Sequence, residues 1–186
     1  MKKTRCAWVT DEQIYIDYHD YEWGRPTYDD RALFEMICLE GAQAGLSWIT
    51  ILKRRENYRE AFDSFDIDTV SQYDENKLQD LMENKGIIRN KLKIKSVVKN
   101  AQAVQRIQER YGSFQTFIWA YVGGKPVKMH RQSQEEIPAF TKESEQMSKD
   151  LKKLGFSFVG PTICYAFMQA TGMVNDHTKG CYLYDE

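Results

Sequence analysis

Apolar residues recur along most of the chain at intervals of three and four residues, the spacing that places side chains on one face of an α-helix. In residues 31–44 the stripe expected to face inward comprises Leu33, Ile37, Glu40 and Ala44. Asp29 or Asp30 can cap the start of this helix, and Gly45 can end it. The pattern therefore predicts a helix that carries one carboxylate, Glu40, on its apolar face.

The same spacing predicts helices along the rest of the chain. Ser47 can begin a helix that continues through the stretch WITILKRRENYREAF, residues 48–62. Further amphipathic stretches occupy residues 75–84, 90–110, 114–122, 142–155 and 161–172. No alternating pattern typical of strands is present, and the longest connection, residues 123–140, is polar in its middle and contains two prolines. These features predict an all-α fold.

The composition is that of a globular protein. A chain of 186 residues with 42% hydrophobic and 28% charged residues can bury a sizeable core. We expect residues 1–186 to form one compact unit, or two lobes in which the N- and C-terminal segments pack against a central helical region at about 60–135. No segment has the roughly 18 apolar residues of a membrane helix, and the first residues lack the apolar part of a signal peptide. The expected location is cytoplasmic, without a membrane partner.

Charge is distributed unevenly, although the net charge is only −1. Residues 85–99 contain no acid and six basic side chains: Lys85, Arg89, Lys91, Lys93, Lys95 and Lys99. The first thirty residues, by contrast, are rich in acids. The basic segment could form a face that binds nucleic acid, or it could be an ordinary solvated helix surface; charge alone leaves both interpretations open.

Two cysteines and two histidines near the ends of the chain form a candidate metal site. They are Cys6, His19, His177 and Cys181. Two sulfurs and two imidazoles are a set that tetrahedral Zn²⁺ prefers, and four protein ligands would make the site structural rather than catalytic. Asp20 and Asp176 each follow or precede a histidine of the set and could orient it. The alternative is that the cysteines are unrelated thiols.

A second candidate site is the turn between the last two predicted helices, in LKKLGFSFVGPTICYAFMQATG. In a helix-hairpin-helix element, backbone N–H groups of such a turn bind a DNA phosphate, helped by the dipole of the second helix. Gly155 and Gly160 would allow close approach of the backbone, and Thr162 adds a hydroxyl. A plain connection between two helices can have the same two glycines, so the pattern alone does not distinguish them.

Glu40 is the third candidate. A buried carboxylate costs several kcal/mol unless it is protonated or hydrogen-bonded, and such groups are concentrated at functional sites. Aromatic residues are dense in the sequence around it: Trp8, Tyr15, Tyr18, Tyr21, Trp23 and Trp48. A carboxylate among aromatic faces suits a planar, cationic ligand that carries an amine. The alternative is that Glu40, close to the end of its helix, reaches solvent while the aromatic residues form core.

Four long stretches of the chain contain most residues of the three candidate sites. In chain order they are AWVTDEQIYIDYHDYEWGRP, LFEMICLEGAQAGLSWITILKRRENYREAF, GIIRNKLKIKSVVKNA and FSFVGPTICYAFMQATGMVNDH. With the flanking cysteines, they resemble the 3-methyladenine-DNA glycosylase I family along nearly the whole chain; the likeness weakens across residues 123–145. The resemblance implies a mostly helical fold of the helix-hairpin-helix superfamily, with a structural zinc that joins the two ends. It also implies hydrolytic removal of N3-methyladenine from double-stranded DNA, which leaves an abasic site and the free base.

The resemblance also assigns roles to individual positions. The base-binding carboxylate of the family falls on Glu40, and its zinc ligands fall on Cys6, His19, His177 and Cys181. Its aromatic pocket residues fall on Trp8, Tyr15, Tyr18, Trp23 and Trp48. The element that enters the gap left by an extruded nucleotide falls on Gly45 and Leu46, beside Gln43. The hairpin that contacts DNA falls on Gly155, Gly160 and Thr162.

The chemistry of the base explains why such a pocket suffices. An enzyme that acts on a base within a duplex must extrude the nucleotide and then read it by stacking and by its edge. N3-methylation makes adenine cationic, so the base leaves readily, and a cation–π contact favours it over neutral adenine by about 1–2 kcal/mol. Bifunctional relatives place a lysine in the hairpin as G-x-K, where this chain has GPT; we therefore expect no lyase activity. Asp176 is a reserve candidate for the carboxylate that matters.

Two other functions are compatible with parts of the pattern. A non-catalytic, zinc-stabilised DNA-binding module would use the basic segment and the hairpin but would release no base. A helical protein with a structural metal and a protein partner would bind neither DNA nor 3-methyladenine. The expected state of the enzyme is a monomer, although the sequence does not determine it.

Overall fold

The structure is a computed structural model that describes residues 3–185. Its helices and strands, within these residues, are α1 (Gln13–Tyr21), α2 (Asp30–Ala42), α3 (Trp48–Leu52), α4 (Arg55–Ala61), η1 (Asp63–Phe65), α5 (Ile67–Ser71), α6 (Glu75–Glu83), α7 (Lys91–Tyr111), α8 (Phe114–Trp119), η2 (Ala120–Val122), β1 (Val127–Lys128), η3 (Gln134–Glu136), α9 (Lys142–Lys153), α10 (Pro161–Ala170) and β2 (Val174–Asn175). The predominantly helical fold predicted from the sequence is confirmed. No described helix is long and apolar enough to cross a membrane.

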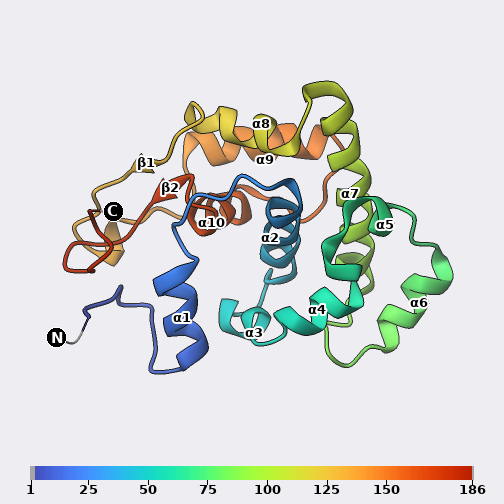
Figure 1. The fold of residues 1–186 in the computed structure, drawn as a ribbon, viewed down its shortest axis with the longest axis horizontal. Coiled ribbons are helices and arrows are strands. Elements are labelled where there is room, and N and C mark those ends of the chain that lie inside the picture. The colour runs from blue at the N-terminus through green and yellow to red at the C-terminus, as the bar shows by residue number, and fades with distance from the viewer. Residues whose placement is uncertain (1–2, 186) are drawn as a thin grey trace.

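Helix α2 lies at the centre of the molecule, between α10 and the long helix α7 (Figure 1). It begins where predicted, because the Asp29 carboxylate accepts the N–H of Ala32. Leu33 and Ile37 are fully buried in the main apolar cluster, to which α7 contributes Val97 and Val104. The apolar stripes read from the sequence in these two helices therefore form the core.

The N- and C-terminal segments meet at one side of the molecule, opposite α7 (Figure 1). A second, smaller apolar cluster lies there, and it combines Cys6, Tyr18 and Trp23 with Cys181 and Leu183. The strands β1 and β2 also lie on this side and pair in parallel, with Val127 opposite Val174. The sequence did not predict this two-residue pairing, which is too short to produce an alternating pattern.

The helix predicted over residues 48–62 is wrong as one element. The structure divides it into α3 and α4, with a turn at Lys53 and Arg54. Leu52 packs into the smaller apolar cluster, whereas Tyr58 and Phe62 pack into the main one. Ile51 of α3 also packs into the main cluster, so α3 lies between the two clusters and α4 continues along the main one.

Candidate functional site

Glu40 projects from the last turn of α2 into a cavity of about 180 Å³. Five aromatic side chains line this cavity with it: Trp8, Tyr15, Tyr18, Trp23 and Trp48. Gln43, the residue that follows α2, also lines the cavity. The structure therefore brings the carboxylate and the five aromatic residues selected from the sequence to one place. The remaining nearby aromatic, Tyr21, is exposed and lies outside the cavity.

The Glu40 side chain has the properties of a group prepared for a ligand. Only 3% of the residue is exposed, and burial raises the pKa of its carboxyl group to about 8. Its Oε2 atom is buried and accepts no hydrogen bond from any described residue. The interpretation in which Glu40 reaches solvent is thus wrong, because Glu40 follows Leu33 and Ile37 on the buried face of α2.

The aromatic side chains surround the cavity in edge-on and tilted arrangements. The Tyr18 and Trp48 rings lie 5.5 Å apart at 45°, and the Trp8 and Trp23 rings lie 5.1 Å apart at 71°. Burial, together with the nearby Glu40, raises the pKa of the Tyr18 phenol, which therefore remains a hydrogen-bond donor. The indole Nε1 of Trp48 is buried and has no acceptor among the described residues. The residues that line the cavity thus include one with an unpaired acceptor and one with an unpaired donor.

Two larger cavities lack this combination. One of about 260 Å³ lies on another side of Trp23 and is mainly apolar, with Pro26, Pro126 and Leu183 in its wall. Another of about 210 Å³ is lined by Arg55 and Glu22, which already form a two-point ion pair at 2.5 and 2.8 Å. A ligand site is indicated by polar groups that the protein leaves without partners, so the Glu40 cavity is the stronger candidate.

A glycine brings α2 close to the loop between α9 and α10. A Cβ atom on Gly41 would lie 3.1 Å from the carbonyl oxygen of Phe158, which is tighter than ordinary packing. Phe158 itself has a positive φ of 56°, unusual for a residue with a side chain. Gly41, immediately after Glu40, therefore lets the carboxylate helix lie against the loop that precedes α10.

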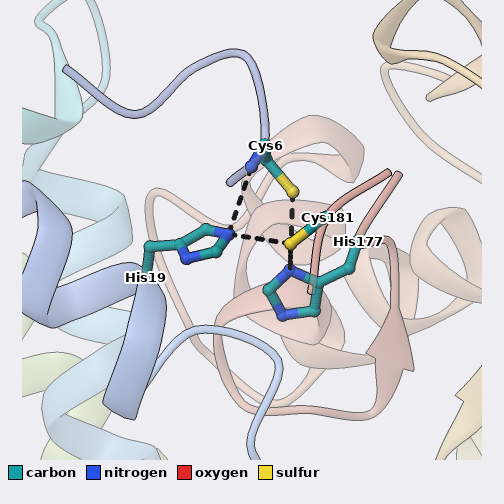
Figure 2. Close-up of side chains that lie close together, drawn as sticks. All are labelled: Cys6, His19, His177 and Cys181. Carbon is teal, nitrogen blue, oxygen red and sulfur yellow. Dashed lines mark hydrogen bonds between the residues drawn. The ribbon is translucent and has the colours of Figure 1, made fainter. Parts of the chain in front are cut away.

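Cys6, His19, His177 and Cys181 point toward one another beside this cavity (Figure 2). The Cys6 sulfur lies 3.4 Å from Nδ1 of His177, and the Cys181 sulfur lies 3.5 Å from Nε2 of His19 and 3.6 Å from Nδ1 of His177. All four residues are buried, and their donor atoms lie within 4.8 Å of one another. The alternative of two unrelated thiols is excluded by this geometry.

The cluster fits a tetrahedral metal ion. Zinc–sulfur and zinc–nitrogen bonds of normal length place neighbouring ligand atoms about 3.5 Å apart, close to the separations observed here. The hydrogen bond between the two thiols lowers the pKa of Cys181 and raises the pKa of Cys6, so Cys181 is the first of the pair to reach the thiolate form that binds metals. The other nitrogen of His19 lies 2.9 Å from the Asp20 carboxylate, and Asp20 is held by two bonds from Arg5. Each of these contacts orients the ligand set.

Asp176 does not orient His177, contrary to the sequence-based prediction. Its buried carboxylate accepts hydrogen bonds from the Tyr165 hydroxyl, from Nε of Arg131 at 3.1 Å and from Nε2 of Gln169 at 2.9 Å. The second nitrogen of His177 instead faces the backbone carbonyl of Trp23 at 3.3 Å. Adjacency in sequence was misleading because successive side chains of an extended segment point in opposite directions.

The cysteine–histidine cluster and the cavity share a wall. The ring of Trp23 lies 4.7 Å from that of His177, and the ring of Trp8 lies 5.3 Å from that of His19. A model of the family described as methyladenine glycosylase matches residues 8–184, which include the cavity residues and three of the four cluster residues. The chain belongs to the methyladenine glycosylase family.

Individual members of the methyladenine glycosylase family are similar to this chain from end to end. DNA-3-methyladenine glycosylase 1 of Escherichia coli is 49% identical over 180 residues, which are 97% of this chain and 96% of that protein. The DNA-3-methyladenine glycosylase of Haemophilus influenzae is 48% identical over 178 residues, 96% of each chain. The resemblance to this family read from the sequence is confirmed.

Solved structures of methyladenine glycosylases have the same fold. A crystal structure of 3-methyladenine DNA glycosylase I, 50% identical, superposes with a TM-score of 0.95 and covers 97% of this chain and all of that one. The enzyme from Staphylococcus aureus, 39% identical, gives 0.94 with 96% of this chain and 95% of that one covered. A related variant, also 39% identical, was solved in complex with 3-methyladenine and gives 0.93, with 96% of each chain covered.

The remaining predicted positions of this family member lie outside the cavity. Gly155, with φ of 97°, ends α9, and Gly160 precedes α10 with an ordinary φ of −63°. Thr162, in the first turn of α10, is exposed. The turn after α2 projects from the surface, with Gly45 at φ of 77° and Leu46 40% exposed. None of these positions lines the cavity, and all but Gly160 are exposed at the surface.

Sequence reasoning missed four cavity residues: Gln134, Ile137, Ala166 and Gln169. Gln134 and Ile137 belong to the stretch at and after η3, in the segment interpreted only as a surface loop. A polar loop interrupted by prolines gives no periodic signal, so its inward-facing residues could not be identified. Gln169 lies one turn beyond Tyr165 on α10, and its role as a link between the cavity and Asp176 depends on tertiary contacts.

Proposed function

We propose that this chain removes 3-methyladenine from alkylated double-stranded DNA by hydrolysis of the N-glycosidic bond, in base-excision repair. The observation that carries the proposal is the buried Glu40 carboxylate, which has an unpaired oxygen in an aromatic cavity. An acceptor in that position suits the amine edge of a purine, and its negative charge suits a base that methylation has made cationic. The names and bound base of the family members described above support the same reaction.

Extrusion of the nucleotide is the first step. Leu46, exposed at the end of a tight turn, would fill the gap in the base stack while Gln43 lies between that turn and the cavity. The hairpin from Gly155 to Thr162 would hold the phosphate backbone through the N–H groups that begin α10. Exposed basic residues of the segment 85–99, namely Lys85, Arg89, Lys91 and Lys99, are available for further phosphates.

Recognition and bond cleavage follow in the cavity. Trp48 would stack on the base, while Glu40 and Tyr18 would bind its edge. The positive charge of the base stabilises ionised Glu40 and so lowers the pKa that burial had raised. The bond between the base and C1′ then breaks with its electron pair moving to the ring, so the base departs neutral. Water adds to C1′ and loses a proton, which leaves the abasic sugar.

The reaction requires no covalent intermediate with the enzyme. The described cavity wall contains no lysine, and the hairpin has Gly160-Pro161-Thr162 where a lyase would have its nucleophile. We therefore propose a monofunctional hydrolase. Asp176 is assigned a structural role, since its three hydrogen bonds commit it to Tyr165, Arg131 and Gln169.

We infer that Cys6, His19, His177 and Cys181 bind one structural zinc ion. The support is the set of ligand separations near 3.5 Å and the burial of all four residues. A bound ion joins the N-terminal segment to the C-terminal segment, and its four protein ligands leave no position for a reacting water. These residues therefore act on the pocket by holding the Trp8 and Trp23 side of its wall.

Release of the free base from methylated duplex DNA tests this function. The wild-type protein should release 3-methyladenine, and Glu40→Gln, which retains the shape but not the charge, should lower kcat/KM on the order of 100-fold. The matched control is Glu35→Gln on the same helix, because Glu35 lies outside the Glu40 cavity and pairs with Arg59. Salt-dependent DNA binding without base release would instead indicate a non-catalytic DNA-binding module.

A further inference from the structure

Lys93 extends from the first turn of α7 to the C-terminal end of α2. Its ammonium group donates hydrogen bonds to two backbone carbonyls, that of Ala42 at 2.9 Å and that of Ala44 at 2.6 Å. Bonds from an ammonium to a carbonyl are stronger than those between neutral groups. A cation is also favoured here because the C-terminal end of a helix carries partial negative charge. Lys93 is thus used within the protein rather than on its solvated surface.

The two carbonyls belong to the turn that the proposed function uses to enter DNA. Within this turn Ala44 donates to the Gly41 carbonyl at 3.3 Å, and Leu46 donates to the Gln43 carbonyl at 2.6 Å. Lys93 supplies the donors for the intervening carbonyls of Ala42 and Ala44. The chain therefore leaves α2 in a direction defined by both backbone bonds and the lysine.

Packing does little to hold the end of the turn. A Cβ atom on Gly45 would have no neighbour within 4 Å, and Leu46 is one of the exposed large apolar residues. A projecting segment of this kind must be fixed from its base if its side chain is to enter a base stack without a large entropic cost. Lys93 bonds the backbone at that base, at Ala42 and Ala44.

Lys93 is itself placed by well-packed structure. The Asn90 side chain caps α7 by accepting the N–H of Lys93 at 3.0 Å. The next residues, Ile94 and Val97, are buried in the main apolar cluster, and α7 packs directly against α2. The ammonium group therefore projects from a rigid helix, which is what a positioning contact requires.

We propose that Lys93 is a positioning residue, which holds the Gln43–Leu46 turn in the orientation that enters the duplex when the nucleotide is extruded. The inference rests on the proposed glycosylase function, and it separates Lys93 from the exposed basic residues that could bind phosphates. It assigns Lys93 to extrusion from DNA and not to recognition of the base, because Lys93 is absent from the wall of the Glu40 cavity.

The test compares three variants of the full-length protein. Lys93→Met removes the donors, Lys93→Arg keeps two or more of them, and Lys95→Met removes an equal charge from a neighbouring position where the lysine pairs with Glu75. With methylated duplex, Lys93→Met should lower kcat/KM for base release about 10- to 100-fold, the loss expected for charge-assisted bonds. Lys93→Arg should recover most of the activity, and Lys95→Met should resemble the wild type.

Two further measurements distinguish positioning from other roles. The affinity for free 3-methyladenine, followed by tryptophan fluorescence, should remain within about twofold in Lys93→Met, because Lys93 does not line the Glu40 cavity. The slope of log affinity for duplex DNA against log salt concentration should also be unchanged. A slope reduced by about one would mean that Lys93 neutralises a phosphate, and it would overturn the inference.

Four other outcomes count against it. A parallel loss of free-base affinity would place the effect in the pocket, and wild-type excision by Lys93→Met would show that the contact is dispensable. Failure of Lys93→Arg to recover activity, although folded, would mean that the donors are not what matters. If the wild-type protein releases no base at all, the proposed function fails and the inference fails with it. If the wild type does release the base, the proposed function stands, and the Lys93 variants then test the inference separately.

Discussion

The cysteine–histidine cluster and the Glu40 cavity are neighbours that use buried polar groups in opposite ways. Both are buried, and both draw on the N-terminal segment and on the last fifth of the chain. In the cluster, the two sulfurs face ring nitrogens of the two histidines. The other ring nitrogen of His19 faces Asp20, and that of His177 faces the backbone carbonyl of Trp23. In the cavity, Glu40 Oε2 and Trp48 Nε1 have no partner among the described residues. A satisfied cluster stabilises the fold, whereas an unsatisfied one reserves its hydrogen bonds for a ligand.

Substitutions in the two sites should change the free energy of unfolding in opposite directions. Removal of a cluster ligand should destabilise the protein, because the remaining polar groups lose a partner. Removal of an unpaired cavity group should leave stability unchanged or increase it, while function suffers. Stability and binding therefore respond oppositely in two sites whose aromatic walls touch, and substitutions in each can test this.

The largest effect on stability is expected from Cys181→Ser. The variant should lose the metal, and its free energy of unfolding should fall by about 3 kcal/mol or more, since metal binding is coupled to folding. Zinc content and denaturant unfolding measure the two effects. Cys164→Ser is the control, because Cys164 is also a buried cysteine but does not belong to the cluster. Its sulfur instead donates to the carbonyl of Val159. Equal metal content in wild type and Cys181→Ser would remove Cys181 from the ligand set.

Glu40 should make stability depend on pH. The pKa of its carboxyl group is about 8 in the folded protein and near 4.5 when unfolded, so the folded state binds the extra proton between these values. Its contribution is therefore fully present below pH 4.5 and is lost progressively as the pH rises to 8. Unfolding curves of wild type and Glu40→Gln should diverge across this window, with the variant more stable at pH 8; parallel curves would mean that Glu40 titrates normally.

A smaller effect distinguishes two indole groups. Trp48→Phe keeps an aromatic face but removes the unpaired N–H, so stability should not fall while affinity for 3-methyladenine weakens by about 1 kcal/mol. Trp119→Phe should do the reverse, because Nε1 of Trp119 donates to the carbonyl of Thr27 at 2.8 Å and lies outside the cavity. Thermal unfolding and tryptophan fluorescence separate the two. Similar destabilisation in both variants would contradict the comparison.

Local signals in the sequence were sufficient for most of the helices. The Asp29 cap, the Leu33, Ile37 and Glu40 stripe of α2 and the amphipathic helix α7 depend on neighbours within one or two turns, and the structure has them as predicted. The helix predicted over residues 31–44 ends earlier, at Ala42, so Ala44 lies outside α2 and is only half-buried. The capping box that begins α9 at Thr141 is equally local. The inward direction of Glu40 followed from the same periodicity, because its position in the stripe is set by Leu33 and Ile37.

Contacts between distant segments were not accessible in this way. Helix α1 was not predicted, since its sequence QIYIDYHDY is polar on several sides and Glu12 provides no side-chain cap. The partners of Asp176 and the cavity residues Gln134 and Ile137 depend on how loops pack, which no residue pattern encodes. The metal ligands could be proposed despite their distance, because cysteine and histidine have few other reasons to occur together.

The contact between Cys6 and His177 in the cysteine–histidine cluster joins residues 171 positions apart, so it can form only late in synthesis. The ribosome releases the first partner long before the last, so helices such as α2 and α7 can already be folded when the C-terminal residues emerge. Trp23 can be held against His177 only then. A nascent chain therefore completes both the α10 side of its core and its binding cavity late.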